Sequence, residues 1–547
     1  MSTKVKKMLF ILSKATIENA YAAFVMANGA RMEGIESEIF FTFFGLEAIQ
    51  KKKLEHLHRI LGDKGIVTGA DVHEGYYTDP RGLGEVCPDV VLRPASTAEL
   101  SQIMKVCHDT AQPVVVQGGL TGLVTGARPQ HNEVVITMER MNGIESIDTK
   151  AGTITVLAGT PLQVVQEAAD AAGMVYPLDL GARGSCTIGG NLSTNAGGNR
   201  VIRYGMTRDL TLGVEAVLAD GTVINSLNGF MKNNTGYDLK QMFIGSEGTL
   251  GLITRATLRL YPKPKTQVVA FCAADSFDAV ADLMAHMRTG LGADLSAFEV
   301  LWAKTYAAVL SDVAGIKAPI PEGHAFYVLV EMMGSDAAHD TEKFETCLGQ
   351  ALENDLIVDA VLSRSNAEID ALWDVRDGMA HAMGKQQPSV GFDISLSVAD
   401  MKVIESELLS RLQAALGDVR LFIGGHLADG NLHLVAKSLK EGPQPRDTIQ
   451  EIIYGWVGEV GGSISAEHGI GLLKRDYLAQ SRSAAELALM RALKQTMDPK
   501  NLLNPGRVFD LGTAPMADNA QTPTPEHARP LPISRAVCRT LSSPSCR

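Results

Sequence analysis

The chain has 547 residues, of which 45% are hydrophobic and 20% are charged, and its formal net charge is −12. This size and composition predict a globular protein with two or three domains, and the acidic balance excludes nucleic acid as the main partner. Seven cysteines without a CxxC pair indicate free thiols in a reducing compartment. No apolar run approaches the roughly 20 residues that span a bilayer, so we expect a cytoplasmic protein without a transmembrane segment.

Residues 5–55 predict a strand, a helix, a second strand and a second helix, which are too few to bury a core alone. The strands are VKKMLFILS and SEIFFTFFGL, and the stretch resembles the beginning of a DsrE/DsrF-like sulfur-relay domain. Sulfur transfer needs a thiol, and residues 1–55 contain no cysteine. We therefore interpret residues 1–55 as a partial DsrE-like α/β appendage of structural value.

The rest of the chain divides into four stretches of different character. An α/β stretch occupies residues 60–262, and residues 268–444 mix amphipathic helices such as SFDAVADLMAHMRTGL with strands such as AFYVLVEMM. Residues 445–510 are mainly helical by the same patterns. Residues 511–547 are rich in Pro, Thr and Ala without periodicity, which predicts a disordered tail.

Three glycine-rich segments lie in the α/β stretch. The first, VVVQGGLTGLVTGA, is a strand that turns into a loop whose backbone amides can cradle a pyrophosphate, although a tight structural turn explains this loop alone equally well. The longer PLDLGARGSCTIGGNLSTNAGGNRVIRYG needs a polar ligand to satisfy its backbone. The third, NNTGYDLKQMFIGSEGTLGLIT, has the same character and ends in a strand. The glycine spacing is not GxGxxG, so we do not expect a Rossmann site.

Two histidine-containing stretches predict a metal site. GHLADGNLH places His426 and His433 on either side of an Asp-Gly turn, where the strands of a hairpin would bring both imidazoles together. SAEHGIG adds Glu467 and His468 on another turn. Two imidazoles and a carboxylate are a familiar divalent-metal set that leaves a position for substrate. Each histidine alone is explained as well by a half-buried side chain with ordinary hydrogen bonds.

Six motifs in order resemble a known flavoprotein family. The glycine-rich segments resemble the FAD-binding domain of the vanillyl-alcohol-oxidase/PCMH flavoproteins. PLDLGARGSCTIGGNLSTNAGG, LADGTVI, NNTGYDLKQMFIGSEGTLG, GHLADGNLH, SAEHGIG and DPKNLLNPG together resemble D-2-hydroxyglutarate dehydrogenases and related D-2-hydroxyacid dehydrogenases, over residues 60–509. The resemblance implies an α+β protein with a PCMH-type FAD-binding domain of two α/β subdomains, an α+β substrate or cap domain, and a helical C-terminal region that completes the active site.

The same resemblance implies which residues hold FAD. The pyrophosphate would be held by Gly118, Gly119, Thr121, Gly122 and Leu123. The rest of FAD would be lined by Ser185, Gly190, Ser193, Asn195, Gly197, Gly198, Glu247, Gly251 and Ile253. Relatives often show GGNTGLV where this chain has Gly119-Leu120-Thr121, which removes one side-chain amide. Leu120 also leaves no histidine at this loop position, so we expect FAD to be bound non-covalently.

The resemblance also assigns roles in the chemistry. The metal ligands would be His426, His433 and Glu467, with zinc as the first choice and manganese or iron as alternatives, and His468 would be the general base. Arg376, in WDVR, would clamp a carboxylate by a bidentate pair; its alternative is a surface arginine paired with Asp374 or Asp377. Asn431 would orient the substrate carboxylate, although Asp-Gly-Asn is also an ordinary turn.

These roles describe the oxidation of a D-2-hydroxyacid to the 2-oxoacid. The metal lowers the pKa of the hydroxyl, an imidazole takes the proton, and the Cα hydrogen leaves as hydride to flavin N5. Relatives specific for hydroxyglutarate use a threonine and a lysine where this chain has Ala380 and Gly391, so a D-lactate-like substrate fits as well as D-2-hydroxyglutarate. The alternatives are a flavin oxidase, a glycolate-oxidase-type subunit, or a non-catalytic sulfur-relay or binding protein.

The motifs that the sequence lacks indicate how the flavin would be reoxidised. No motif forms a nicotinamide site or an iron–sulfur cysteine cluster, so we expect a separate electron acceptor such as an electron-transfer flavoprotein or a quinone. A homodimer is compatible with the sequence, which does not specify an oligomeric state.

Overall fold

A computed structural model of the chain describes residues 7–12, 25, 26, 28, 30–32, 36–41, 53–78 and 86–511. The expected tail from residue 512 onward and most of the expected appendage lie outside the described residues. Within the appendage, β1 (Lys7–Leu12) and β2 (Glu36–Phe41) pair in parallel. Among all the described residues, no helix is both long enough and apolar enough to cross a bilayer.

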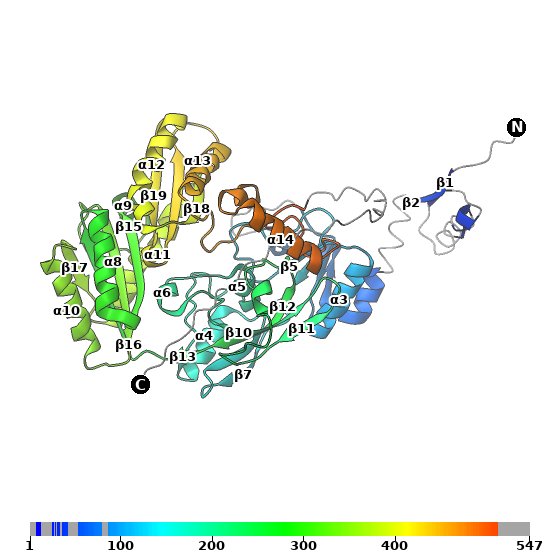
Figure 1. Cartoon of the computed structure of the whole chain (residues 1–547), viewed down its shortest axis with the longest axis horizontal. Coiled ribbons are helices and arrows are strands. Elements are labelled where there is room, and N and C mark those ends of the chain that lie inside the picture. The colour runs from blue at the N-terminus through cyan, green and yellow to red at the C-terminus, as the bar shows by residue number, and fades with distance from the viewer. Residues whose placement is uncertain are drawn as a thin grey trace, which may run out of the picture. The chain divides into compact units, whose positions relative to one another are not determined.

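The half of the chain that carries the glycine-rich segments contains a four-stranded sheet in the order β3-β4-β6-β5 and a five-stranded sheet in the order β11-β10-β12-β8-β7 (Figure 1). Its strands are β3 (Ile66–Thr68), β4 (Val90–Leu92), β5 (Val114–Gln117), β6 (Val134–Thr137), β7 (Ile144–Asp148), β8 (Thr153–Leu157), β10 (Thr211–Val217), β11 (Val223–Ser226) and β12 (Leu252–Arg259), with β9 (Met174–Val175) pairing with β13 (Tyr261–Pro262). Its helices are α3 (Thr97–Asp109), α4 (Leu162–Ala171), α5 (Ile188–Thr194), α6 (Val201–Tyr204) and α7 (Lys240–Phe243).

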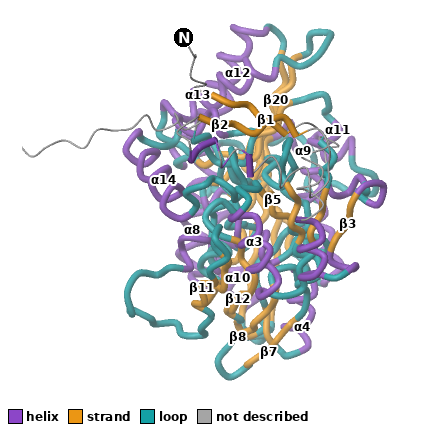
Figure 2. The backbone as a smooth tube through the Cα atoms, turned by 90° about the vertical axis from the view of Figure 1, so that its right-hand side faces the viewer, coloured by secondary structure: helices purple, strands orange, loops and turns teal. Residues whose placement is uncertain are grey.

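The second half is built on a seven-stranded sheet in the order β17-β14-β16-β15-β19-β20-β18. The strands are β14 (Thr266–Ala274), β15 (Leu295–Trp302), β16 (Phe326–Gly334), β17 (Asp359–Leu362), β18 (Val390–Ser395), β19 (Val419–His426) and β20 (Asn431–Ser438). Strand β14 is almost wholly apolar because helices cover both faces of the sheet: Val268 and Ala270 enter one core, and Val269 and Phe271 enter the other. Figure 2 shows the strands gathered in the interior, with helices and loops around them.

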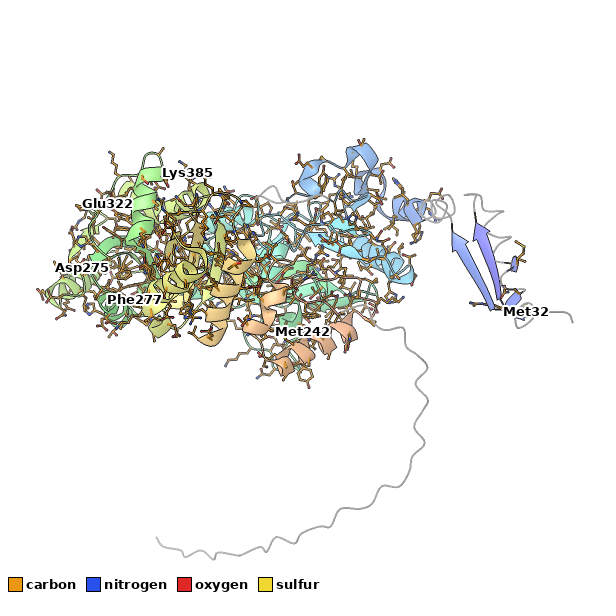
Figure 3. The ribbon with its side chains drawn as sticks, turned by 90° about the horizontal axis from the view of Figure 1, so that it is seen from above. Met32, Met242, Asp275, Phe277, Glu322 and Lys385 are labelled. Atoms are coloured by element: carbon orange, nitrogen blue, oxygen red, sulfur yellow. The ribbon has the colours of Figure 1, made fainter. Side chains whose placement is uncertain are left out.

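Different helices cover the two faces of this sheet. One core contains residues of α8 (Phe277–Leu291), α10 (Asp340–Glu353), α12 (Val398–Leu416) and α13 (Arg446–Glu459). The other contains residues of α9 (Ala303–Asp312) and α11 (Asn366–Lys385), and we call the surface beneath them the α9–α11 face. Figure 3 labels two ends of these helices, Phe277 at the start of α8 and Lys385 at the end of α11.

The hairpin expected around GHLADGNLH is confirmed. Strands β19 and β20 are antiparallel and joined by the short 3-10 turn Leu427–Asp429. Gly430 completes the turn at φ 87°, a left-handed conformation that favours glycine. The register places Gly424 opposite His433 and His426 opposite Asn431, so both imidazoles emerge at the same end of the sheet.

The C-terminal segment returns to the glycine-rich half. Helix α14 (Ala484–Met497) begins with a capping box between Ser483 and Glu486. Near its end the Nζ of Lys494 donates to the carbonyl oxygens of Thr249 (2.9 Å) and Leu503 (2.8 Å). The chain then reaches β5, where Asn504 accepts a hydrogen bond from the backbone N–H of Val116 at 2.9 Å. The last described segment is therefore part of the wall of the first half.

Candidate active site

Five polar side chains form a row across the α9–α11 face of the seven-stranded sheet. They come from adjacent strands in the order β16, β15, β19, β20 and β18, and they are Glu331, Glu299, His426, His433 and Asp393. In each strand the flanking apolar residues, such as Leu432 and Leu434 beside His433, point into the opposite core. Because side chains alternate across a strand, the polar residues must point to the α9–α11 face.

His433 lies near both His426 of the neighbouring strand and Glu467 of the SAEHGIG loop. The Nε2 atoms of His426 and His433 are 3.4 Å apart, and the Nε2 of His433 is 3.5 Å from Oε1 of Glu467. Tetrahedral ligands with metal bonds of about 2.0–2.2 Å lie about 3.4 Å from one another. The spacing of each of these two pairs therefore fits two ligands of one divalent cation, and the set of all three residues stays a prediction. Burial and the neighbouring His426 lower the pKa of His433 to about 3, so its imidazole is neutral and able to ligate at neutral pH.

Glu299 fixes the orientation of His426 and holds Arg376. The Nδ1 of His426 donates to Oε1 of Glu299 at 2.8 Å, which leaves Nε2 facing His433. The Nε of Arg376 donates to the other carboxylate oxygen of Glu299 at 2.9 Å. Burial would raise the pKa of Glu299, but the charges of Arg376 and His426 outweigh it and lower the pKa to about 2. A carboxylate behind a ligating imidazole sets its tautomer, and the sequence analysis missed this residue.

Asp393 holds the loop that carries Glu467 and His468. Its Oδ2 accepts hydrogen bonds from the backbone N–H groups of Ala466 (3.0 Å), Glu467 (3.1 Å) and His468 (2.9 Å). Lys474 supports the same carboxylate at 3.7 Å. Burial would raise the pKa of Asp393, but the charges of His468 and Lys474 keep it well below its usual range. Both Asp393 and Lys474 were missed from the sequence.

A second set of possible ligands overlaps with the first. Ligand atoms of Asp393, His433, Glu467 and His468 all lie within 4.8 Å of one another. Oδ2 of Asp393 is occupied by three backbone donors, while its Oδ1 has no hydrogen-bond partner among the described residues and stays available to a cation. Asp393 can therefore anchor the loop and also serve as a ligand, and the set with His426 stays a prediction.

A cleft in the glycine-rich half adjoins this cluster. Three buried polar atoms of residues that line it have no hydrogen-bond partner in the described part of the chain: Gln117 Oε1, Thr187 Oγ1 and Asn191 Nδ2. Glycine is required where its loops meet, because a Cβ on Gly119 would lie 1.9 Å from the carbonyl oxygen of Ser185. A long polar ligand such as FAD fits a cleft with unsatisfied polar groups and a backbone-lined floor.

The predicted FAD residues fall into three groups. Those that line the cleft are Gly118, Gly119, Thr121, Gly122, Gly190, Ser193, Glu247, Gly251 and Ile253. Leu123 and Gly198 instead line the adjoining cavity. Ser185 packs its backbone against Gly119, Gly197 lies next to Glu467, and the Oδ1 of Asn195 accepts from the backbone N–H of Arg208. The roles of all these residues toward FAD stay predictions.

Glu247 joins the cleft to the histidine cluster. Its carboxylate oxygens accept the backbone N–H groups of Ile470 (2.7 Å) and Gly471 (2.8 Å), two residues of the SAEHGIG loop. Burial raises the pKa of Glu247, and these two donors oppose the rise. The loop is thus fixed from one side by Asp393 and from the other by a residue of the cleft.

His468 lies on the boundary between the cleft and a second cavity. It lines the cleft and also a cavity of about 1160 Å³ that is bordered by His426, His433, Glu467 and Arg376. Its ring is nearly parallel to that of His433, with centroids 5.8 Å apart. A ligand in the large cavity can therefore touch His468 and the predicted metal ligands together, with the glycine-lined cleft next to it.

The two predicted substrate residues differ in their surroundings. Arg376 borders the large cavity, and besides Glu299 its Nη1 contacts Asp377 Oδ1 at 3.2 Å, which was its expected alternative partner. Its Nη2 lies 3.1 Å from Nε2 of His426. Asn431 is buried, and its Oδ1 has no hydrogen-bond partner among the described residues. Their roles toward a substrate stay predictions.

Comparison with known families matches most of the chain to flavoproteins. Residues 88–226 match an FAD binding domain, residues 263–508 match the C-terminal domain of FAD linked oxidases, and residues 4–70 match a DsrE/DsrF/DrsH-like family. Among solved structures, p-cresol methylhydroxylase with substrate bound aligns over 85% of this chain and 98% of its own, with a TM-score of 0.67 and 16% identity. At that identity the likeness shows the fold alone, which is the expected PCMH type.

Curated relatives are similar over most of their length. The mitochondrial D-2-hydroxyglutarate dehydrogenase of Arabidopsis thaliana is 38% identical, over 84% of this chain and 82% of the relative. The mitochondrial enzyme of the same name from Bos taurus is 41% identical, over 77% of this chain and 76% of the relative. The D-2-hydroxyglutarate dehydrogenase of Xanthomonas citri pv. viticola is 39% identical, over 78% and 90%.

Proposed function

The chain belongs to the FAD-linked D-2-hydroxyacid dehydrogenases, and from this premise we propose that the histidine cluster and the flavin cleft together oxidise a D-2-hydroxyacid to its 2-oxoacid. The position of His468 carries the proposal: its imidazole borders both the cleft and the cavity with the predicted metal ligands, where the other shared residue, Val124, is apolar. An oxidation that removes the hydroxyl proton, and a hydride from the carbon that bears the hydroxyl, needs a base next to the oxygen and a hydride acceptor next to the carbon.

The described side chains divide the work as follows. His468 takes the hydroxyl proton, and its place is fixed because Asp393 binds the backbone N–H of His468 at 2.9 Å. Arg376 binds the carboxylate of the substrate. FAD, when bound in the cleft, supplies the hydride acceptor, and a divalent cation would polarise the hydroxyl.

His426, His433 and Glu467 would hold that cation, with zinc as the first candidate. The support is the 3.4 and 3.5 Å spacing of their ligand atoms and the Glu299 carboxylate behind His426. The Nε2 lone pair of His426 cannot serve both a cation and the Nη2 of Arg376, which lies 3.1 Å away. Cation binding would therefore break this contact, and Nη2 would keep its ion pair with Oε2 of Glu299 at 2.9 Å.

The route of the electrons and the location of the protein belong to the same proposal. A separate carrier, such as an electron-transfer flavoprotein or a quinone, would reoxidise the flavin. A cytoplasmic location is supported by the scarcity of cysteine pairs in the sequence.

Anaerobic bleaching of the flavin tests this function. The purified full chain should be yellow, and its flavin absorbance should fall on addition of a D-2-hydroxyacid but not of the L-enantiomer. Prior treatment with a chelator should slow the bleaching, and zinc should restore it. A flavin that no D-2-hydroxyacid reduces would refute the proposal, and steady hydrogen peroxide formation in air would favour an oxidase instead.

A further inference from the structure

The large cavity continues beyond the histidine cluster along the β18–β20 pair. Building on the proposed function, we propose that this extension receives the side chain of the substrate and that the enzyme prefers D-2-hydroxyacids whose side chain carries no charge. The residues that would decide this preference are Gly391, Val435, Ala380 and Met383, which all border the cavity.

The floor of the extension is formed by Gly391 of β18 and Val435 of β20, which lie two residues along their strands from Asp393 and His433. Asp393 is opposite His433, and Gly391 is opposite Val435. Residues two apart in a strand point to the same face and lie about 6.8 Å apart. A substrate anchored at the histidine cluster would therefore meet Gly391 and Val435 with the part of its side chain that lies beyond C2.

The roof is a stripe of helix α11. Arg376, Met379, Ala380 and Met383 follow the spacing of one helical face and all border the cavity. Met379, Met383 and Val435 are buried members of one apolar cluster. The roof beyond Arg376 is therefore apolar like the floor.

Small residues leave this space open. A Cβ on Gly391 would meet only the carbonyl oxygen of Leu434, at 4.0 Å. Ala380 of α11, in the roof, adds only a single methyl group. Ser389, 4% exposed, borders the same cavity, and its Oγ has no hydrogen-bond partner among the described residues. The extension thus has room for a branched side chain and can offer a neutral hydroxyl to it.

No positive charge stands on the Gly391–Val435 pair or on the α11 stripe beyond Arg376. Arg376 is assigned to the C1 carboxylate of the substrate, and Lys474 donates to the backbone carbonyls of Asp393 and Ile464. Arg183 comes from the glycine-rich half, and Arg446 is the exposed first residue of α13. A second carboxylate at the Gly391–Val435 pair would lose water without gaining a cation. This cost disfavours dicarboxylic substrates.

Turnover of the full-length, FAD-loaded enzyme with a dye acceptor tests the preference. We expect kcat/KM for D-lactate and D-2-hydroxyisocaproate to exceed that for D-2-hydroxyglutarate and D-malate by about tenfold or more, since a lost charge-assisted hydrogen bond is worth at least a factor of that size. A kcat/KM for D-2-hydroxyglutarate equal to or above that for the neutral acids would overturn the inference and leave the proposed function intact. Turnover of none of these acids would overturn both.

A matched pair of variants locates the side-chain site. Gly391→Lys adds a cation to the floor, and Gly391→Met adds a chain of similar length without charge. We expect the ratio of kcat/KM for D-2-hydroxyglutarate to that for D-2-hydroxyisocaproate to be about tenfold higher in Gly391→Lys than in Gly391→Met. Equal ratios in the two variants would show that the side chain of the substrate does not face Gly391.

Discussion

Replacement of Glu299 by glutamine tests whether this residue sets the tautomer of His426 in the proposed metal site. Glu299 is 1% exposed and accepts hydrogen bonds from His426 at 2.8 Å and from Arg376 at 2.9 Å. Glutamine keeps the shape, but it can donate to Nδ1 of His426 and so move the imidazole proton to Nε2, the atom that faces His433. Changes to such supporting groups lower metal affinity by about 10–100-fold, and we expect zinc affinity in Glu299→Gln to fall within this range.

Glu331→Gln is the matched control, because Glu331 is also buried on the α9–α11 face and pairs with an arginine, Arg200, at 3.1 Å. Breaking a buried ion pair costs about 3–5 kcal/mol, so both variants should lose comparable free energy of unfolding in urea. Zinc affinity of the FAD-loaded proteins, measured by competition with a chromophoric chelator, should fall only in Glu299→Gln. Equal affinities in the two variants would refute the role of Glu299.

Three further outcomes follow from the described contacts. His468→Asn should retain FAD absorbance but slow anaerobic flavin reduction by about 10²–10⁴-fold, and a full rate would exclude it as the base. Folding lowers the pKa of Glu299 from 4.5 to about 2, so the stability that its carboxylate contributes is present above pH 4.5 and is lost as the pH falls toward 2. The difference in free energy of unfolding in urea between the parent and Glu299→Gln should therefore narrow from pH 6 to pH 3. A constant difference would contradict this. Iodoacetamide at pH 8 should label the exposed Cys87 but not the buried Cys107 or Cys272, because burial raises the pKa of both buried thiols to about 12. Peptide mass spectrometry would detect the labels, and equal labelling of all three cysteines would contradict the burial.

The residues that could be predicted from sequence lie in short motifs. His426 and His433 are joined by one tight turn, so their proximity is a local property of the hairpin. Glu299 could not be placed in the same way, because it reaches His426 only through the pairing of β15 with β19, strands separated by more than a hundred residues of chain. Such pairings depend on the order of strands in the whole sheet, which periodicity does not specify.

A weaker signal was nevertheless present in the strands. Glu299 is the single charged residue of LSAFEVLW, Asp393 that of VGFDIS, and Glu331 that of FYVLVEMMG. A carboxylate in an otherwise apolar strand is buried at a cost unless it has partners, and each of these three has them. A lone carboxylate of this kind therefore marks a polar network even when its partners cannot be named.

Asn504 stands almost at the end of the described chain, yet it borders the flavin cleft and donates to the carbonyl oxygen of Glu247 at 2.6 Å. A ribosome must therefore synthesise the chain through residue 504 before this wall of the cleft is present. Cofactor uptake then belongs to the released protein rather than to the growing one, and a message truncated shortly before this codon would yield a product unable to close around its flavin.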